Sequence, residues 1–160
     1  MMCMQKENQV VNNFEEERRK FFTELGESKN MVLSTSADDK VTSRMMSVII
    51  FDGCFYFQTD ITFRKCGQIL KNPNVALCAD NISVEGVCTE IGKPNDNAVF
   101  VKLFAEKYNW SYNKYSSIKN ERLFKIEPTK IQKWIYENTE PYIESFDFVN
   151  KLYNKKLYIC

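Results

Sequence analysis

The pattern of apolar and polar positions in the first part of the chain predicts one helix followed by three strands. Apolar residues at helical spacing among charged ones predict an amphipathic helix over 12–25, ended by Gly26. Three β-rich runs come next, separated by aspartate-containing turns of the kind that close hairpins. The strands are expected at 31–36, 41–51 and 54–58, with turns at Asp38-Asp39 and Asp52-Gly53. This order predicts an antiparallel meander.

The remainder of the chain predicts more short strands around further helices. One helix is expected over 62–71, with Thr62 as its N-cap and Asn72-Pro73 after its end. Another is expected around 95–108, and the polar stretch 109–120 predicts a loop. Strands are expected at 75–79, 82–92, 122–128 and 130–137, and the tail alternates well enough for one or two edge strands.

Many short antiparallel strands with few helices indicate a mainly β protein, a small antiparallel β-barrel with flanking helices. The chain has 160 residues, which suits a single domain over 1–160. Its net charge of +1 provides no general attraction for nucleic acid or an anionic membrane, so neither partner is expected. No apolar run approaches the roughly 20 residues that span a bilayer.

Histidine is absent, which excludes Ser-His and Cys-His nucleophile pairs, histidine zinc sites and histidine-ligated haem. The cysteines contain no C-x-x-C pair, and we expect no metal site. No signal peptide is recognisable, so we expect a cytoplasmic protein with reduced thiols. Cys54, Cys78 and Cys88 fall inside predicted strands and are interpreted as small apolar fillers.

Hydroxyl and cationic side chains gather in FYFQTDITFRKCGQ, residues 55–68, where a strand runs into a helix. Counting outward from the Asp52-Gly53 turn places Arg44 level with this junction. The combination suits a phosphate monoester, because guanidinium and ammonium groups make charge-assisted hydrogen bonds and a helix start offers free N–H groups. The alternative is that these cations are solvated surface groups. The candidate phosphate ligands are Arg44, Thr59, Thr62, Arg64 and Lys65.

The run TDITFRKCGQILKNPNVAL resembles the pyridoxamine 5′-phosphate oxidase-like, FMN-binding split-barrel superfamily. Members typically show a strand arginine, a strand ending in Thr or Ser, an S-R-K or S-x-K turn, and then N-P-x-V-A-L. Arg44, Thr59, Arg64 and Lys65 match in order and spacing, and the resemblance covers roughly residues 29–137. One position departs from the pattern, because Phe63 stands where the family has serine.

The resemblance implies a homodimer with FMN at the interface and a phosphate held by the matched residues. It also implies that backbone around Met45, Met46 and Gln58 runs along the flavin ring. Gln68, one helical turn past the matched lysine, is a further candidate ligand. Trp134 resembles the family's late I-E-F-W tryptophan, which approaches the flavin from the partner subunit, although it equally suits a sheet-face core position.

The reaction is constrained by the residues that come after that tryptophan. True pyridoxamine-phosphate oxidases carry an Arg-x-His-x-Arg arrangement there, whereas this chain reads YENTEPYIES, with Glu137, Glu140 and Glu144. Carboxylates repel a phosphorylated substrate, so oxidation of pyridoxamine phosphate is not expected. The resemblance then implies an oxidoreductase of unknown substrate in which FMN carries the redox chemistry, and no catalytic residue is named.

Several alternatives stay open at this level. The alternatives are a flavin-binding sensor or storage module without turnover and a cofactor-free split barrel, although the retained cationic positions favour the oxidoreductase slightly. A deazaflavin also presents phosphate groups, whereas haem is disfavoured by the missing histidine. The aromatic residues of 93–120 either stack on a planar ligand or close the barrel; they include Tyr108, Trp110, Tyr112 and Tyr115.

Overall fold

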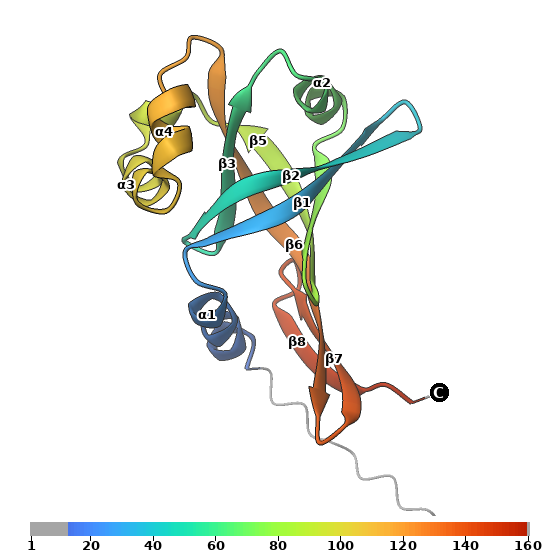
Figure 1. Cartoon of the computed structure of the whole chain (residues 1–160). Helices are drawn as coiled ribbons and strands as arrows, with labels where there is room; N and C mark the ends of the chain where they lie inside the picture. Colours follow the sequence, from blue (N-terminus) through green and yellow to red (C-terminus); the bar gives the residue numbers. More distant parts are fainter. Residues whose placement is uncertain (1–12, 160) are drawn as a thin grey trace, which may run out of the picture.

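The computed structural model describes residues 13–159 (Figure 1). The helices are α1 (Phe14–Leu25), α2 (Arg64–Lys71), α3 (Ala98–Lys107) and α4 (Asn109–Tyr115), with a 3-10 turn at Pro94–Asp96. The strands are β1 (Ser28–Ala37), β2 (Lys40–Phe51), β3 (Cys54–Asp60), β4 (Asn74–Ala79), β5 (Ile82–Glu90), β6 (Glu121–Glu137), β7 (Glu140–Asp147) and β8 (Leu152–Leu157). Cys3 and Cys160 lie outside the described residues.

Six strands close into an antiparallel barrel. They are ordered β3-β2-β1-β4-β5-β6, and the pairing of β3 with β6 closes the circle. β7 and β8 continue the sheet beyond β6 and form an arm that projects from the barrel in Figure 1. The predicted mainly β split barrel with flanking helices is confirmed, as are the edge strands of the tail.

Strand β6 belongs to both the barrel and the arm. Its first half pairs with β3 and β5, and its second half pairs with β7. The β5 register shifts between Glu85 and Gly86, where a Cβ on Gly86 would come within 2.7 Å of the Glu127 carbonyl oxygen. The sequence predicted two strands for the residues of β6, at 122–128 and 130–137. The structure instead contains one continuous strand with an irregularity that glycine accommodates.

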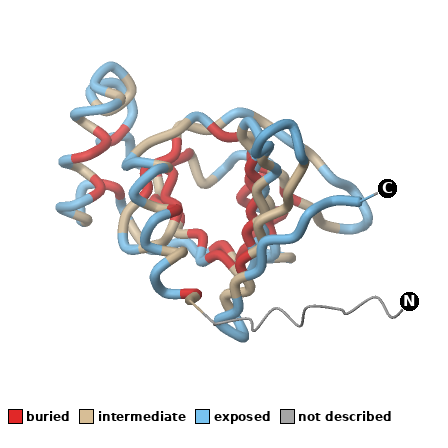
Figure 2. Tube along the Cα trace, turned by 90° about the horizontal axis from the view of Figure 1, so that it is seen from below, coloured by how far each residue is buried: buried red, intermediate tan, exposed pale blue. Residues whose placement is uncertain are grey.

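The core lies inside the barrel, and in Figure 2 the buried stretches of the trace surround the barrel interior. Phe57 and Phe124 stack across the β3–β6 closure with ring centroids 5.2 Å apart. A second buried cluster lies outside the closure, where Phe100 and Phe104 of α3 pack against Leu123. Apolar side chains therefore line both faces of the strands that close the barrel.

Three local predictions were wrong. The stretch 109–120 contains α4, whose Tyr112 packs against the second buried cluster, so the tertiary contact supports a helix in a polar sequence. The N-cap of α2 is Phe63 rather than Thr62. Cys78 is exposed rather than a core filler. Within residues 13–159, no helix is long and apolar enough to cross a membrane.

Candidate functional site

A cavity of about 390 Å³ opens at the end of the barrel where β3 runs into α2. Four of the predicted cofactor ligands line it, namely Met46, Gln58, Thr59 and Lys65. The rest of its wall comes from Asp60 and Phe63 and, across the opening, from Tyr115, Ile118 and Glu121. One side of the cavity therefore consists mainly of residues from the segment 55–68 that the sequence singled out. The opposite side runs from the end of α4 to the first residue of β6.

Arg44 is held beside this region by neutral acceptors. Its Nη1 donates to the Leu33 carbonyl oxygen at 3.2 Å and to Thr35 Oγ1 at 2.7 Å, and its Nη2 donates to Thr42 Oγ1. Both threonine hydroxyls donate onward to Gln68 Oε1 at 2.7 Å. Among the described residues, these bonds leave the Nε–H and one Nη2–H without a partner, and adjacent N–H groups of this kind bind a phosphate bidentately.

Gln68, which the sequence offered as a cofactor ligand, therefore lies behind Arg44. Its Oε1 accepts from two threonines, and its Nε2 donates to the Lys40 carbonyl oxygen at 3.2 Å. Thr35, one of those threonines, is only 1% exposed. The amide of Gln68 thus fixes the Arg44 guanidinium through the threonine hydroxyls.

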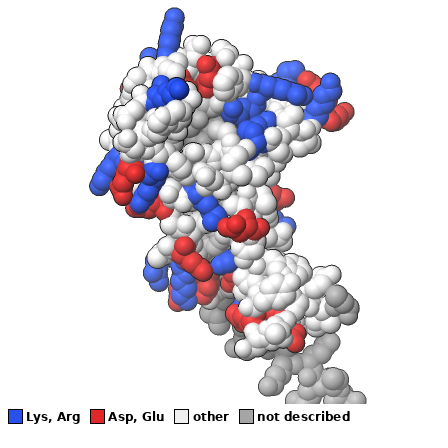
Figure 3. Space-filling model, in the orientation of Figure 1, with Lys and Arg blue, Asp and Glu red and all other residues white. Residues whose placement is uncertain are grey.

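The cations around the cavity lack ion-pair partners within residues 13–159. No ion pair in the described chain involves Arg44, Arg64 or Lys65. Burial lowers the pKa of Lys65, which is 9% exposed, and the Arg44 charge lowers it further. Burial and the neighbouring Arg64 likewise lower the pKa of Arg44. Figure 3 shows Lys and Arg side chains gathered beside α2, so this end of the barrel favours an anion.

Thr62, predicted as a phosphate ligand, is bonded within the turn instead. Its backbone N–H and its hydroxyl both donate to Asp60 Oδ1, at 2.8 and 2.7 Å, and these bonds lower the Asp60 pKa. Phe63 follows at the N-cap, where it cannot supply the hydroxyl of the family's serine. Its ring instead lies 4.6 Å from Lys65 Nζ, in a cation–π contact. Thr62 therefore shapes the turn, and Phe63 supports the lysine.

Two polar residues on the α4–β6 side were missed by the sequence reasoning, and one of them, Glu121, lines the cavity. Glu121 begins β6 and is 7% exposed, and Ser116 follows α4. Ser116 Oγ donates to Gln58 Oε1 at 2.7 Å, and Gln58 lines the cavity together with Glu121. Only the pairing of Asp60 with Glu121 in the β3–β6 ladder brings this carboxyl to the site. No local sequence signal indicates that pairing.

The remaining candidates lie outside the cavity. Met45 is 63% exposed, whereas its neighbour Met46 lines the cavity. Trp134 lies thirteen positions along β6 from Glu121 (134 − 121), which is up to about 43 Å at 3.3 Å per residue. It packs on the arm against Tyr136 and Tyr158, with centroids 6.3 and 5.2 Å away. Trp134 therefore does not reach the cavity of its own chain.

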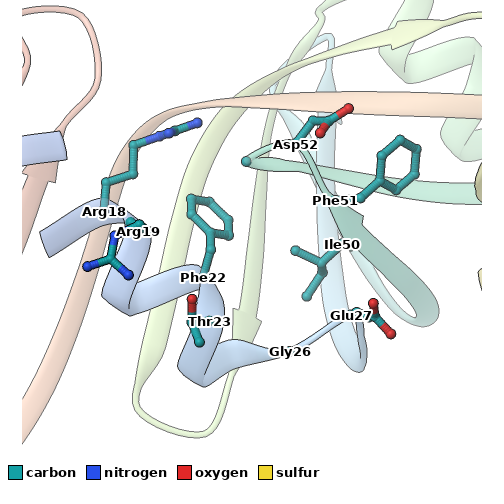
Figure 4. A pocket seen from close by; sticks show the side chains of 10 residues that line it. Arg18, Arg19, Phe22, Thr23, Gly26, Glu27, Ile50, Phe51 and Asp52 are labelled. Atoms are coloured by element: carbon teal, nitrogen blue, oxygen red, sulfur yellow. The ribbon is translucent and has the colours of Figure 1, made fainter. Parts of the chain in front are cut away.

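A larger cavity of about 630 Å³ lies at the opposite end of β3, between α1 and the β2–β3 turn (Figure 4). Arg18 borders it, with a guanidinium 5.6 Å from the Phe22 ring centroid and 3.7 Å from Glu15. The carboxylates of Glu27 and Asp52 also line it. None of the predicted cofactor ligands does, so we place the candidate site in the smaller cavity.

The profile of the pyridoxamine 5′-phosphate oxidase family matches residues 14–135. The chain belongs to this family. The match covers the barrel and the cavity, and it ends at the start of the arm. No curated protein matches the chain.

Several solved structures share the fold of this chain. General Stress Protein 26 from Bacillus anthracis is 26% identical, with a TM-score of 0.55, over 72% of this chain and 90% of that one. PhzG from Burkholderia lata, solved with tetrahydrophenazine-1-carboxylic acid, is 12% identical, with a TM-score of 0.64, over 100% and 98%. A pyridoxamine 5′-phosphate oxidase-related, FMN-binding protein from Nostoc punctiforme is 12% identical, with a TM-score of 0.58, over 99% and 100%.

Proposed function

We propose that this protein binds FMN in the cavity beside α2 and acts as an FMN-dependent oxidoreductase. The observation that carries the proposal is a buried lysine next to an arginine with unused N–H groups, neither of them in an ion pair in the described chain. Burying uncompensated cations is costly, and a phosphate monoester offsets that cost. FMN, when bound, supplies the hydride or electron chemistry.

The chain's own residues bind and orient the cofactor in this proposal. Arg44 offers its free N–H edge to the phosphate, Lys65 and Arg64 add charge, and the Thr59 hydroxyl adds a neutral donor. Thr62 and Gln68 act indirectly, through the turn at Asp60 and through the threonines that hold Arg44. A deazaflavin with a phosphate satisfies the same cations, so the identity of the flavin is part of the test.

We further propose that the working unit is a homodimer. Strand β6 carries Trp134 away from the cavity of its own chain, out along the arm. A tryptophan in that position contacts a flavin only in a second copy. Size-exclusion chromatography with light scattering measures the mass directly, and a monomer at micromolar concentration contradicts this assignment.

The arm also bears on the substrate. Glu137 forms an ion pair with Lys155, and Glu144 accepts a hydrogen bond from Tyr153 Oη at 2.8 Å. These carboxylates are built into the β6–β7–β8 arm where true pyridoxamine-phosphate oxidases carry cations. We infer that pyridoxamine phosphate is not the substrate, and that addition of pyridoxamine phosphate to the FMN-loaded protein yields no pyridoxal phosphate.

The central experiment measures FMN affinity. Wild-type protein is expected to be yellow as purified and to quench the fluorescence of added FMN. The double variant Arg44→Ala with Lys65→Ala is expected to lose both properties. A matched control, Lys102→Ala with Lys130→Ala, removes the same charge from exposed positions on α3 and β6 and is expected to bind as the wild type does. Undiminished binding by the first double variant would overturn the phosphate site.

A second measurement separates an enzyme from a flavin-binding module. The FMN-loaded protein is mixed with reduced nicotinamide cofactors and a panel of electron acceptors, and turnover is followed by absorbance. Sustained oxidation supports the oxidoreductase. Bound flavin with no turnover across the panel supports a sensor or storage role instead.

A further inference from the structure

One buried carboxyl group faces the proposed FMN cavity from the first residue of β6. Glu121 is 7% exposed and lines the same wall space as Lys65, Gln58 and Phe63. The Gln58 side chain lines the same cavity, and its Oε1 accepts a hydrogen bond from Ser116 Oγ at 2.7 Å. Glu121 takes part in none of the ion pairs of residues 13–159. A carboxyl is therefore held in the cavity without a salt bridge to any cation of the described chain.

The charges around Glu121 come from two elements, β3 and α2. Asp60, at the end of β3, is its partner in the strand ladder, and Lys65 faces it from α2. The α4–β6 connection contributes uncharged groups, Tyr115 and Ile118. Burial raises the pKa of Glu121, and Asp60 raises it further, whereas Gln58 and Lys65 lower it. The carboxyl therefore keeps its proton to a higher pH than an exposed glutamate does.

A phosphorylated flavin adds a further negative charge to this space and displaces the water that screens it. An ionised Glu121 opposes that charge, whereas a protonated Glu121 does not. A flavin without a phosphate, such as riboflavin, meets no comparable repulsion. The same carboxyl thus affects two otherwise identical ligands differently.

We propose that Glu121 sets the preference of the cavity for phosphorylated over unphosphorylated flavin, weakening FMN binding when ionised and permitting it when protonated. This inference rests on the proposed FMN site. It adds a specificity-determining residue that acts against the cations, so that FMN is held less tightly than Arg44, Arg64 and Lys65 alone would hold it.

The proposal couples FMN binding to proton uptake. Because a bound phosphate favours the neutral carboxyl, FMN affinity falls as the pH rises through the pKa of Glu121 in the free protein. The second pKa of a phosphate monoester is about 6, so at pH near 8 the ligand is already a dianion and contributes little to the uptake. Riboflavin serves as the ligand without this titration.

The test compares dissociation constants for FMN and riboflavin at pH near 8 by flavin fluorescence. Glu121→Gln keeps the hydrogen-bonding shape of the side chain and removes its charge. This variant is expected to tighten FMN binding about tenfold, the effect of roughly one pKa unit of relieved repulsion, and to change riboflavin binding by less than about twofold. Glu127→Gln is the matched control, an exposed β6 glutamate paired with Lys125 outside the cavity, and is expected to change neither.

Calorimetry in two buffers of different ionisation enthalpy then measures the protons taken up per FMN. Wild-type protein is expected to take up a fraction of a proton that Glu121→Gln does not. The wild-type ratio of FMN to riboflavin affinity, measured between about pH 7.5 and 8.5, where the phosphate stays a dianion, needs no variant and is expected to fall as the pH rises.

The outcomes separate the two proposals. If wild-type protein binds neither flavin, the FMN site is overturned and this inference falls with it. If FMN binds, and the ratio is independent of pH or Glu121→Gln changes both ligands equally, only the role of Glu121 is overturned. Loss of FMN binding in Glu121→Gln with an unchanged melting temperature contradicts the proposal in sign.

Discussion

Replacement of Lys65 by methionine is expected to stabilise the flavin-free protein while it weakens FMN binding. Burial lowers the pKa of this lysine, and Arg44 lowers it further, so the folded chain holds the ammonium at a cost. The unfolded chain binds this proton more tightly, and at neutral pH the charge therefore destabilises the fold. Methionine keeps a flexible apolar stem and removes the charge.

The magnitudes follow from the contacts of Lys65. The variant loses the cation–π contact with Phe63, whose half-exposed ring contributes about 0.5–1 kcal/mol. It also removes an ammonium that is buried without an ion pair in the described chain, and single stabilising substitutions commonly contribute about 0.5–2 kcal/mol. We expect the relief to exceed the loss by about 0.5 kcal/mol, which for a domain of this size raises the melting temperature by about 1–2 °C.

FMN binding is expected to move in the opposite direction. One charge-assisted hydrogen bond to the phosphate contributes about 1.5–3 kcal/mol, so the dissociation constant rises about 10- to 150-fold. Thermal unfolding of flavin-free protein and fluorescence titration with FMN measure the two effects. Lys71→Met is the matched control on the same helix, since Lys71 is exposed and pairs with Asp38 at 2.8 Å; it is expected to change stability by less than about 0.5 kcal/mol.

The effect on stability and the effect on FMN binding can each be contradicted separately. A Lys65→Met protein that melts below the wild type without flavin shows that the buried ammonium is compensated after all. A variant that melts higher but binds FMN with unchanged affinity shows that Lys65 is a strained structural residue and no phosphate ligand.

Three further predictions concern stability and reactivity. Gly67→Ala is expected to stabilise the protein by about 0.5–1 kcal/mol, because the added Cβ on α2 meets open space. Gly86→Ala is expected to destabilise it by about 1–3 kcal/mol, because the added Cβ presses on the Glu127 carbonyl. Melting temperatures that shift in the same direction for both variants contradict the packing argument. Burial raises the pKa of Cys88 to about 12, so at pH 8 a maleimide reagent is expected to label exposed Cys78 well before Cys88, as measured by peptide mapping with mass spectrometry; equal labelling refutes the burial. Gln68→Leu is expected to weaken FMN binding several-fold, because the two threonines that hold Arg44 lose their shared acceptor; an unchanged FMN affinity removes this positioning role.

The parts of the fold that the sequence predicted are those with local causes. Period-two alternation and an Asp-Gly turn determine β2, β3 and their hairpin, because each signal acts over a few residues. The unpredicted parts depend on contacts between distant segments. Helix α4 is supported by packing against α3 and its neighbours, and the continuity of β6 depends on Gly86 of another strand.

The same difference between local signals and long-range contacts explains which half of the candidate site could be predicted from the sequence. Its cationic half comes from residues 44–68, close together in the chain, where cations, hydroxyls and a strand–helix turn form a recognisable pattern. Its acidic half reaches the cavity only because the β3–β6 pairing closes the barrel and sets Glu121 opposite Asp60. The sequence therefore indicated only attraction for a phosphate, whereas the folded cavity places that attraction beside a buried carboxyl. In our proposals, affinity for FMN depends on the balance of these opposed charges, and that balance is decided by a long-range strand register.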